Sequence, residues 1–387
     1  MGSARNALLA LAVGAFAIGT TEFTPMGLLP VIAQDLHISV PKAGSLVSAY
    51  AFGVMIGAPI MTLLLGAVSR KAALIGLMGL YIVGNLGSGL SHSYTMLMIW
   101  RVVTSLSHGA FFGLGAVEAS SVVAPERRAS AVASMFMGLT IANIFGVPAA
   151  TWLGDTMGWR SAFLVTALLG AVAVLALSLA LPPRGRSVRP DIMGELRVLM
   201  GTEVLLALAV TTLGAGIMFM LYTYIAPFLH SITHAGDGLV TLALMTIGVG
   251  FSIGAALGGR LADRSTRFAL LLMLPVLGGI MLVYPFIAVS SFGAIIGILV
   301  WSAASFAIMP ALQMRTMQAA RGAPALASSV NIGAFNLGNA LGAWLGGVVL
   351  SQGLGYGAVS MSGAFLALIA GLIVYFYRAP VRDQDAQ

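Results

Sequence analysis

A glutamate, an arginine and a histidine are the residues of this sequence best placed to handle protons. Glu22 lies inside an apolar stretch, residues 7–33, that carries no other formal charge and is long enough to cross a bilayer as a helix. Arg101 lies inside a second such stretch, and His108 follows it by seven residues on nearly the same helical face. A central acidic residue costs about 2.5–3.5 kcal/mol in a bilayer, so these positions indicate transport or proton transfer.

Two interpretations of this group remain open. A proton taken up by Glu22 would cancel its charge, release Arg101 and change which helix packing is favoured. Alternatively, Glu22 and Arg101 form a static ion pair that only supports the structure. His108 either relays protons, because imidazole titrates near neutrality, or fixes the packing by a hydrogen bond. Glu118, further along the same stretch, is expected to pair with Arg127 or Arg128.

Composition places the chain among polytopic membrane proteins. Of its 387 residues, 59% are hydrophobic and 8% are charged, whereas a soluble domain has about 25% charged residues. The basic residues do not cluster on one element, which argues against a nucleic-acid partner. The absence of cysteine excludes thiolate metal sites, and the scattered histidines lack the spacing of metal ligands. We therefore expect no metal and no cofactor.

The chain is predicted to cross the membrane twelve times, which gives an all-α fold. Cutting the apolar runs at charges and at Pro, Gly and Ser clusters defines these spans. Their limits are 7–33, 43–66, 72–91, 94–123, 129–153, 158–181, 203–229, 238–260, 268–289, 292–314, 325–349 and 355–377.

The basic residues orient the predicted spans. Sixteen of the 19 Lys and Arg residues lie on the side of the two termini, and only Lys42 and Arg160 lie on the other side. The positive-inside rule therefore predicts that both termini are cytoplasmic in a bacterial inner membrane.

A single long polar stretch after the sixth span predicts two six-span halves. It runs from Pro182 to Glu203 and has the composition of a cytoplasmic linker. The predicted parts are an N-terminal bundle at residues 1–181, the linker at 182–202 and a C-terminal bundle at 203–387.

The two halves also resemble each other at an offset of about 196 residues. The fifth span contains "NIFGVPAATWLG" from Asn143, and the eleventh contains "NALGAWLGGVVL" from Asn339. Gly146 and Gly342 coincide at the same offset. Such parallel repeats are typical of transporters whose halves rock about a site between them.

Polar side chains inside the spans either line a solute cavity or bond neighbouring helices, because a buried amide or hydroxyl group must find a partner. Both interpretations stay open for each member of this group: Tyr50, Asn85, Asn143, Tyr222, Tyr224, Asn331, Asn336 and Asn339. In the fifth span, Gly138, Gly146 and Pro148 are expected to let the helix bend and pack closely.

With these motifs identified, the whole chain resembles the twelve-span drug:proton antiporter branch of the major facilitator superfamily. Within it, the likeness is to the arabinose-efflux-permease-like group of sugar, nucleoside and chloramphenicol exporters. The stretches that carry the likeness are "GTTEFTPMGLLPVIAQDL", "RVVTSLSHGAFFG", "GLTIANIFGVP" and "GGRLADRSTR". The resemblance implies the major facilitator fold. It maps the family's acid to Glu22, its arginine to Arg101 and its bending antiporter element to Gly146 and Pro148, which favours export over uptake.

One departure from the family pattern concerns a cytoplasmic latch of charged residues. The family expects an Asp-Arg pair between spans two and three, but this chain has "TLLLGAVSRK" there. The corresponding loop of the second half keeps the pattern in Gly259, Asp263, Arg264 and Arg267. We therefore expect the stronger latch in the second half, and we expect Arg70 and Lys71 only to orient the chain.

These observations predict a transporter rather than an enzyme. The leading hypothesis is a proton-coupled exporter of a small drug-like, sugar-like or nucleoside-like solute, driven by the proton gradient and working by alternating access as a monomer. The alternative is an uncoupled facilitator in which Glu22 and Arg101 are a structural pair. No glycine-rich loop followed by Lys and Ser or Thr indicates a nucleotide-driven pump.

Overall fold

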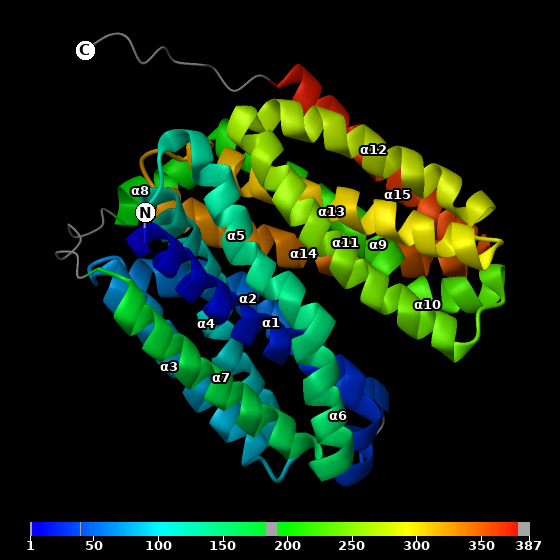
Figure 1. Cartoon of the computed structure of the whole chain (residues 1–387), viewed down its shortest axis with the longest axis horizontal. Helices are drawn as coiled ribbons and strands as arrows, with labels where there is room; N and C mark the ends of the chain where they lie inside the picture. The colour runs from blue at the N-terminus through cyan, green and yellow to red at the C-terminus, as the bar shows by residue number, and fades with distance from the viewer. Residues whose placement is uncertain (1, 39, 183–191, 378–387) are drawn as a thin grey trace.

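The computed structural model describes residues 2–38, 40–182 and 192–377, and these residues form a bundle of membrane-length helices (Figure 1). Within that part of the chain, twelve helical segments are long and apolar enough to cross a membrane, and each overlaps a span predicted from the sequence. The all-α fold with twelve spans is therefore confirmed. A helix satisfies its own backbone hydrogen bonds, which a segment exposed to lipid requires.

Among its described residues, the first half contains seven α-helices and two short connecting elements. They are α1 (Gly2–Asp35), α2 (Val40–Leu64), α3 (Arg70–Gly89), α4 (Tyr94–Ser121), the 3-10 turn η1 (Pro125–Arg127), α5 (Arg128–Ile141), the π-helical turn η2 (Ala142–Gly146), α6 (Val147–Met157) and α7 (Trp159–Ala180).

In residues 192–377, the second half contains eight α-helices and one π-helical turn. They are α8 (Ile192–Leu199), α9 (Thr202–Tyr222), α10 (Ile225–Phe228), η3 (Leu229–Thr233), α11 (Asp237–Arg264), α12 (Thr266–Ile287), α13 (Ser291–Ala319), α14 (Pro324–Ser351) and α15 (Gly355–Phe376).

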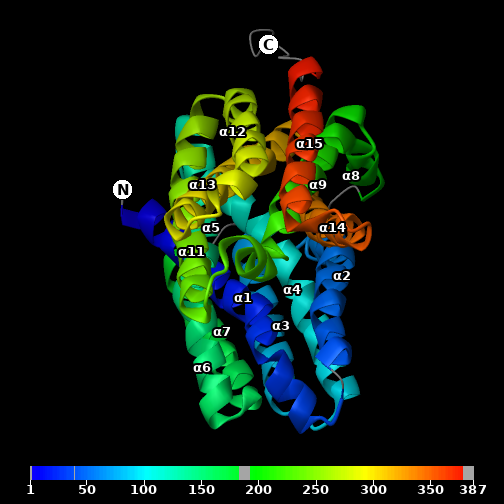
Figure 2. The same ribbon diagram turned by 90° about the vertical axis from the view of Figure 1, so that its right-hand side faces the viewer.

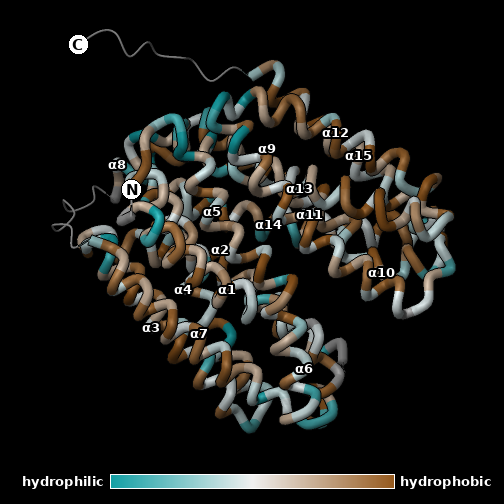
Figure 3. Tube along the Cα trace, in the orientation of Figure 1, coloured by the Kyte–Doolittle hydropathy of each residue, from teal (hydrophilic) through white to brown (hydrophobic). Residues whose placement is uncertain are grey.

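In Figure 1, α1–α7 and α9–α15 form two groups that meet near the N-terminus and diverge away from it, and in the perpendicular view of Figure 2 the two groups overlap. Hydrophobic residues occur along much of these helices, as Figure 3 shows by colour, and many of them are exposed, with Leu179 and Phe376 at 80% and 75%. Such a surface suits lipid rather than water. Part of the predicted linker, residues 183–191, lies outside the described residues, and α8 follows it. The limits 1–181, 182–202 and 203–387 stay a prediction.

The halves repeat each other in side-chain contacts as well as in sequence. Lys71 at the start of α3 donates to the Ser178 carbonyl at 2.6 Å, at the end of α7. At an offset of 196 residues, Arg267 of α12 donates to the carbonyl of Val374 at 3.4 Å, at the end of α15. A cation at a helix C-terminus bonds carbonyls that have no partner within the helix. In each half, a basic side chain thus joins two equivalent helices, α3 to α7 in the first half and α12 to α15 in the second.

The expectation that Arg70 and Lys71 only orient the chain is therefore wrong. Besides the Lys71 contact, Arg70 Nη1 lies 3.4 Å from Glu118 Oε2. This pair gives Glu118 a partner that was not predicted, because the start of α3 lies beside the end of α4, where Glu118 is buried.

Two seams join the halves on the side where α1 begins and α15 ends, which we call the terminal side. One seam lies between α5 and α11, and the other lies between α14 and the helices α2 and α4. In the second seam the Thr62 hydroxyl donates to Ser329 at 2.6 Å, and the Ser328 hydroxyl donates to the Gly113 carbonyl at 3.0 Å. Both of these hydrogen bonds join neutral groups.

The opposite side carries a separate cluster at the end of α1. Asp35 Oδ2 accepts hydrogen bonds from Trp159 Nε1 at 3.0 Å and Arg160 Nη1 at 2.8 Å. The indole hydrogen bond, followed by the interaction with Arg160, holds the pKa of Asp35 below its ordinary value. The cluster ties the end of α1 to the start of α7.

Candidate functional site

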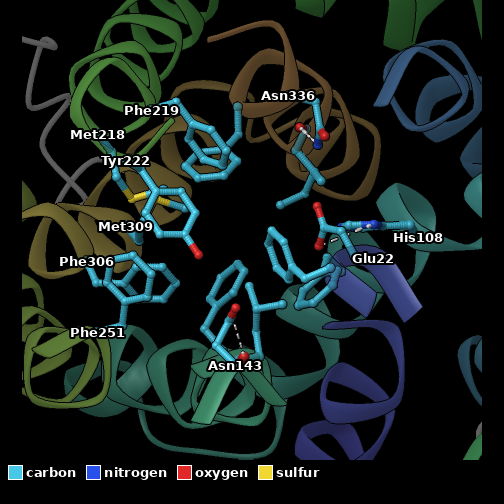
Figure 4. A pocket seen from close by; sticks show the side chains of 16 residues that line it. Glu22, His108, Asn143, Met218, Phe219, Tyr222, Phe251, Phe306, Met309 and Asn336 are labelled. Carbon is cyan, nitrogen blue, oxygen red and sulfur yellow. Dashed lines mark hydrogen bonds and ion pairs between the residues drawn. The ribbon is translucent and has the colours of Figure 1, made fainter. Parts of the chain in front are cut away.

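A cavity of about 870 Å³ lies between the halves. Its walls come from the later parts of α1, α9 and α14, the early parts of α2 and α11, and the residues around η2, all of which approach the opposite side. The seams close the terminal side, so the cavity opens away from it. A narrower extension of about 40 Å³ continues inward (Figure 4). That extension has room for only a few water molecules.

Glu22 places a carboxylate in both the cavity and its extension. Its side chain is 14% exposed, and its Oε2 lies 4.0 Å from Nδ1 of His108. Figure 4 shows the two side chains meeting at one wall. The same His108 nitrogen lies 3.3 Å from the Tyr50 hydroxyl. Glu22, His108 and Tyr50 therefore form one polar group, drawn from α1, α4 and α2.

Arg101 lies behind this group and is fully buried. Its Nη1 donates to the Thr21 carbonyl at 2.9 Å, and its guanidinium lies over the Tyr50 ring, 4.2 Å from the centroid. Its Nε and Nη2 have no hydrogen-bond partner. The positive charge is thus held within the first half, away from the cavity surface.

The proposed ion pair between Glu22 and Arg101 is not formed. Consecutive residues of an α-helix point about 100° apart. The Thr21 hydroxyl lies 3.4 Å from Arg101 Nη1, whereas Glu22 faces the cavity and His108. A sequence places the two residues at similar depth but leaves this rotation undetermined.

The structure brings five of the eight predicted cavity residues to the cavity wall. These are Tyr50, Asn143, Tyr222, Asn336 and Asn339. Figure 4 shows the Tyr222 hydroxyl pointing into the extension, across from Glu22. Asn339 is distinctive among them because its buried Oδ1 has no hydrogen-bond partner.

The other three predicted cavity residues hold helices together instead. Asn85 Oδ1 accepts from the hydroxyl groups of Thr21 and Thr166. The same kind of network surrounds Asn331, whose amide donates to Gln313 at 2.6 Å. The Tyr224 hydroxyl donates to the Ala343 carbonyl at 2.8 Å. Because the polar groups of these side chains are satisfied by other helices, the cavity prediction for them is wrong.

The predicted bending element coincides with the π-helical turn η2. Pro148 lacks the N–H that would continue the helix, and π turns often occur at functional sites. A Cβ at Gly138 would collide with the Ala12 carbonyl, and one at Gly146 would collide with the Thr20 hydroxyl. The two glycines therefore let α5 and η2 approach α1 closely, while Pro148 lines the cavity.

An apolar wall on the second half was not predicted from the sequence. It consists of Met218, Phe219, Phe251, Phe306 and Met309, which line the extension opposite Glu22 (Figure 4). The offset of 196 residues could have predicted one member of this wall, because Met218 is the residue of the second half that is equivalent to Glu22. The second half thus presents a thioether where the first presents a carboxylate.

Among the predicted latch residues, Asp263 makes the hydrogen bonds between the halves. Its Oδ1 accepts from the backbone N–H groups of Ala129 at 2.8 Å and Ser130 at 3.2 Å, and its Oδ2 accepts from the Ser130 hydroxyl. The carboxylate therefore caps the N-terminus of α5, where negative charge is favoured. Gly259 keeps α11 close to Ala133, whereas Arg264 is exposed and Arg267 bonds α15.

Asp263→Asn is expected to loosen the seam between α5 and α11 by about 1 kcal/mol, because the cap loses its charge. A cysteine at Thr140, which is buried there against Ser252, should then react about fivefold faster with a water-soluble thiol reagent. The chain has no cysteine of its own, so this reporter is unambiguous.

Asp155→Asn is the matched control, because Asp155 is an exposed acid near the end of α6 on the opposite side. It should leave the reactivity at position 140 unchanged. Equal rates in Asp263→Asn and the parent would contradict the latch.

Comparison with known proteins adds a family match and close relatives. The Major Facilitator Superfamily model matches residues 11–326. The inner membrane transport protein YdhP of Escherichia coli K12 is 59% identical over 95% of both chains. The chloramphenicol resistance protein of Streptomyces lividans is 30% identical over 97% of this chain and 96% of its own length.

Among solved structures, the E. coli fucose:proton symporter FucP superposes with a TM-score of 0.77. The superposition covers 95% of this chain and 98% of that one, at 15% sequence identity. This likeness concerns the fold, with its two pseudo-symmetric six-helix bundles.

Proposed function

Because this chain belongs to the Major Facilitator Superfamily, and is therefore a membrane transporter and not an enzyme, we propose that it exports a small solute in exchange for protons. The observation that carries the proposal is the position of Glu22. It is the only acidic residue among those that line the cavity in the described part of the chain. A carboxylate at this place can bind a proton arriving through the open side.

The proposed orientation places the terminal side in the cytoplasm of a bacterial inner membrane. The distribution of Lys and Arg supports it, and so does the name of the YdhP relative. In this orientation the cavity opens to the periplasm, and the two seams close the cytoplasmic side.

The proposed cycle uses Glu22 as the proton carrier. In the outward-open state, Glu22 takes a periplasmic proton and the carboxylate becomes neutral. Arg101 stays positive, so protonation changes the net charge of this region by one unit, which biases the packing of the helices around it. In the inward-open state, release of the proton restores the carboxylate and prepares the cavity for a cytoplasmic solute.

His108 and the π-helical turn complete the proposed mechanism. The His108 imidazole lies within reach of both Glu22 and Tyr50, so it can share a proton with either side chain. The η2 turn lies where α5 and α6 pack on α1, next to the cavity. Rearranging this turn would couple the charge of Glu22 to the closure of the outer side.

Two solute classes remain within the proposal. The methionine and phenylalanine wall suits a drug-like aromatic compound, and the name of the chloramphenicol relative is consistent with this. The amides of Asn143, Asn336 and Asn339 suit a sugar or nucleoside, and Asn339 Oδ1 has no other partner. The uncoupled facilitator stays the alternative, although the direct Glu22–Arg101 ion pair that it assumed is not formed.

The decisive experiment measures proton movement in proteoliposomes that contain a pH-sensitive dye. Amphenicols, sugars and nucleosides are added one at a time, with the membrane potential clamped by potassium and valinomycin. We expect one class to drive a proton flux opposite to its own. A solute that crosses the membrane without any proton signal would overturn the antiport proposal.

A further inference from the structure

Arg101 is a fixed positive charge that lies close to the cavity but is not part of its wall. The residues that line the cavity include Glu22 and Tyr50 but not Arg101, whose exposed fraction is 0%. Two of its guanidinium nitrogens, Nε and Nη2, have no hydrogen-bond partner. Unmet charged donors attract anions strongly when nothing covers them.

The Tyr50 ring covers this charge on the side of the cavity. The guanidinium carbon of Arg101 lies 4.2 Å from the centroid of Tyr50 and 5.9 Å from that of Phe163. Of these two rings, only Tyr50 belongs to the cavity wall. The cation therefore lies against the inner face of Tyr50, in an arrangement that the ring quadrupole favours.

The Tyr50 ring is held in this orientation from its outer end. Its hydroxyl lies 3.3 Å from His108 Nδ1, and the two rings lie 5.8 Å apart. Tyr50 itself is 2% exposed, so its neighbours leave the ring little room to turn. The shield is thus a packed and hydrogen-bonded part of the wall.

We propose that Tyr50 sets the charge selectivity of the cavity by shielding Arg101, so that Glu22, once it has released its proton, is the charged group that an entering solute meets. The cavity then takes solutes that are neutral or carry one positive charge, and it rejects anions. This assignment of a solute class rests on the proposed function, which makes the cavity the solute site. The shielding of Arg101 does not depend on proton coupling.

The physical reason is the distance dependence of charge interactions in a poorly hydrated site. Two unit charges 8 Å apart interact by about 0.5 kcal/mol in water, and about four times more strongly at the effective dielectric constant of a protein. Removing the ring admits water and solute to the guanidinium. An anionic solute could then contact the guanidinium of Arg101 directly, while a positively charged solute would be repelled by it.

A charge-sensitive reporter tests the shield without knowledge of the natural solute. Val47→Cys places a single thiol in the cavity wall, one helical turn before Tyr50. Its reaction rate is measured with two methanethiosulfonates of similar size, one carrying a trimethylammonium group and one carrying a sulfonate group. The ratio of the cationic to the anionic rate reports the local potential.

We expect the cationic reagent to react faster in the parent protein, and we expect Tyr50→Ala to lower the ratio by about tenfold. Tyr50→Phe keeps the ring and should keep the ratio. Adding Arg101→Gln to Tyr50→Ala should restore it, because the change arises from the charge of Arg101. A thiol at Leu244, on the second half of the wall, should respond less.

An unchanged ratio in Tyr50→Ala would overturn the proposal, as would an equal fall in Tyr50→Phe. A neutral methanethiosulfonate reports whether each variant keeps the cavity, and Tyr50→Leu replaces the alanine variant if that protein does not fold. Failure of the exchange mechanism would appear differently, as the absence of solute-driven proton flux with the reagent ratios unchanged.

Discussion

Glu22→Gln is expected to abolish uphill export while solute still crosses downhill. The amide keeps the size and polarity of the side chain but cannot gain or lose a proton near neutral pH. For one-for-one exchange, a pH difference of about one unit sustains about a tenfold solute gradient, because both correspond to about 1.4 kcal/mol. In Glu22→Gln, the ratio of the solute concentrations on the two sides of the membrane should reach one. Solute accumulation in proteoliposomes with an imposed pH difference measures this.

Two further substitutions separate the role of Glu22 from that of any buried acid. Glu22→Asp keeps an ionisable group in the cavity and should retain part of the gradient. Glu118→Gln removes a carboxylate that is 2% exposed and lies at Arg70, outside the cavity wall, so the gradient should persist. If Glu22→Gln still accumulated solute as well as the parent, the proton would have to be carried elsewhere.

Gly138→Ala is expected to destabilise the folded protein by about 3 kcal/mol or more. The added methyl group would overlap the backbone carbonyl of Ala12, which cannot turn away as a side chain can. Either α1 and α5 separate or the helices bend, and overpacking of this kind costs about 1–3 kcal/mol even where side chains can adjust. The melting temperature of the purified protein in detergent should fall by several degrees.

Gly76→Ala is the matched control for the same chemical change. Gly76 lies in α3 at an exposed position, and a Cβ there would meet no atom within 4 Å. Alanine favours the helix over glycine by about 0.8–1.0 kcal/mol, so this variant should be slightly more stable. Opposite signs for the two substitutions would establish the close approach of α5 to α1, and equal signs would refute it.

The spans were predictable because the signals that define them are long and additive. Runs of about twenty apolar residues, interrupted by arginines, leave little choice of element, and the offset of 196 residues also relates the Lys71 and Arg267 contacts. In contrast, the partner of Glu22 depends on helix rotation. A rotation of about 100° about the axis of α1 decides whether Thr21 or Glu22 faces Arg101, and apolar spans fix rotation only weakly.

The roles of the asparagine side chains inside the spans could not be predicted from the sequence either. Asn143 and Asn331 both lie inside spans of mixed Gly, Ala and Asn composition, yet one lines the cavity and the other bonds Gln313. Which case applies depends on a residue of another helix that the local sequence does not contain. The apolar wall at Phe251 and Phe306 was missed for a related reason, because membrane spans contain many such residues that face lipid.

The unlike chemistry of the two seams gives the closed side a preferred order of opening. Between α5 and α11, a carboxylate holds the N-terminus of a helix of the other half, whereas the α14 seam depends on hydroxyl contacts such as Thr62 with Ser329. Charge-assisted bonds are about twice as strong as neutral ones. We therefore expect the α14 seam to open before the seam between α5 and α11 on the terminal side. A solute that enters from this side would then pass first beside α2 and α4.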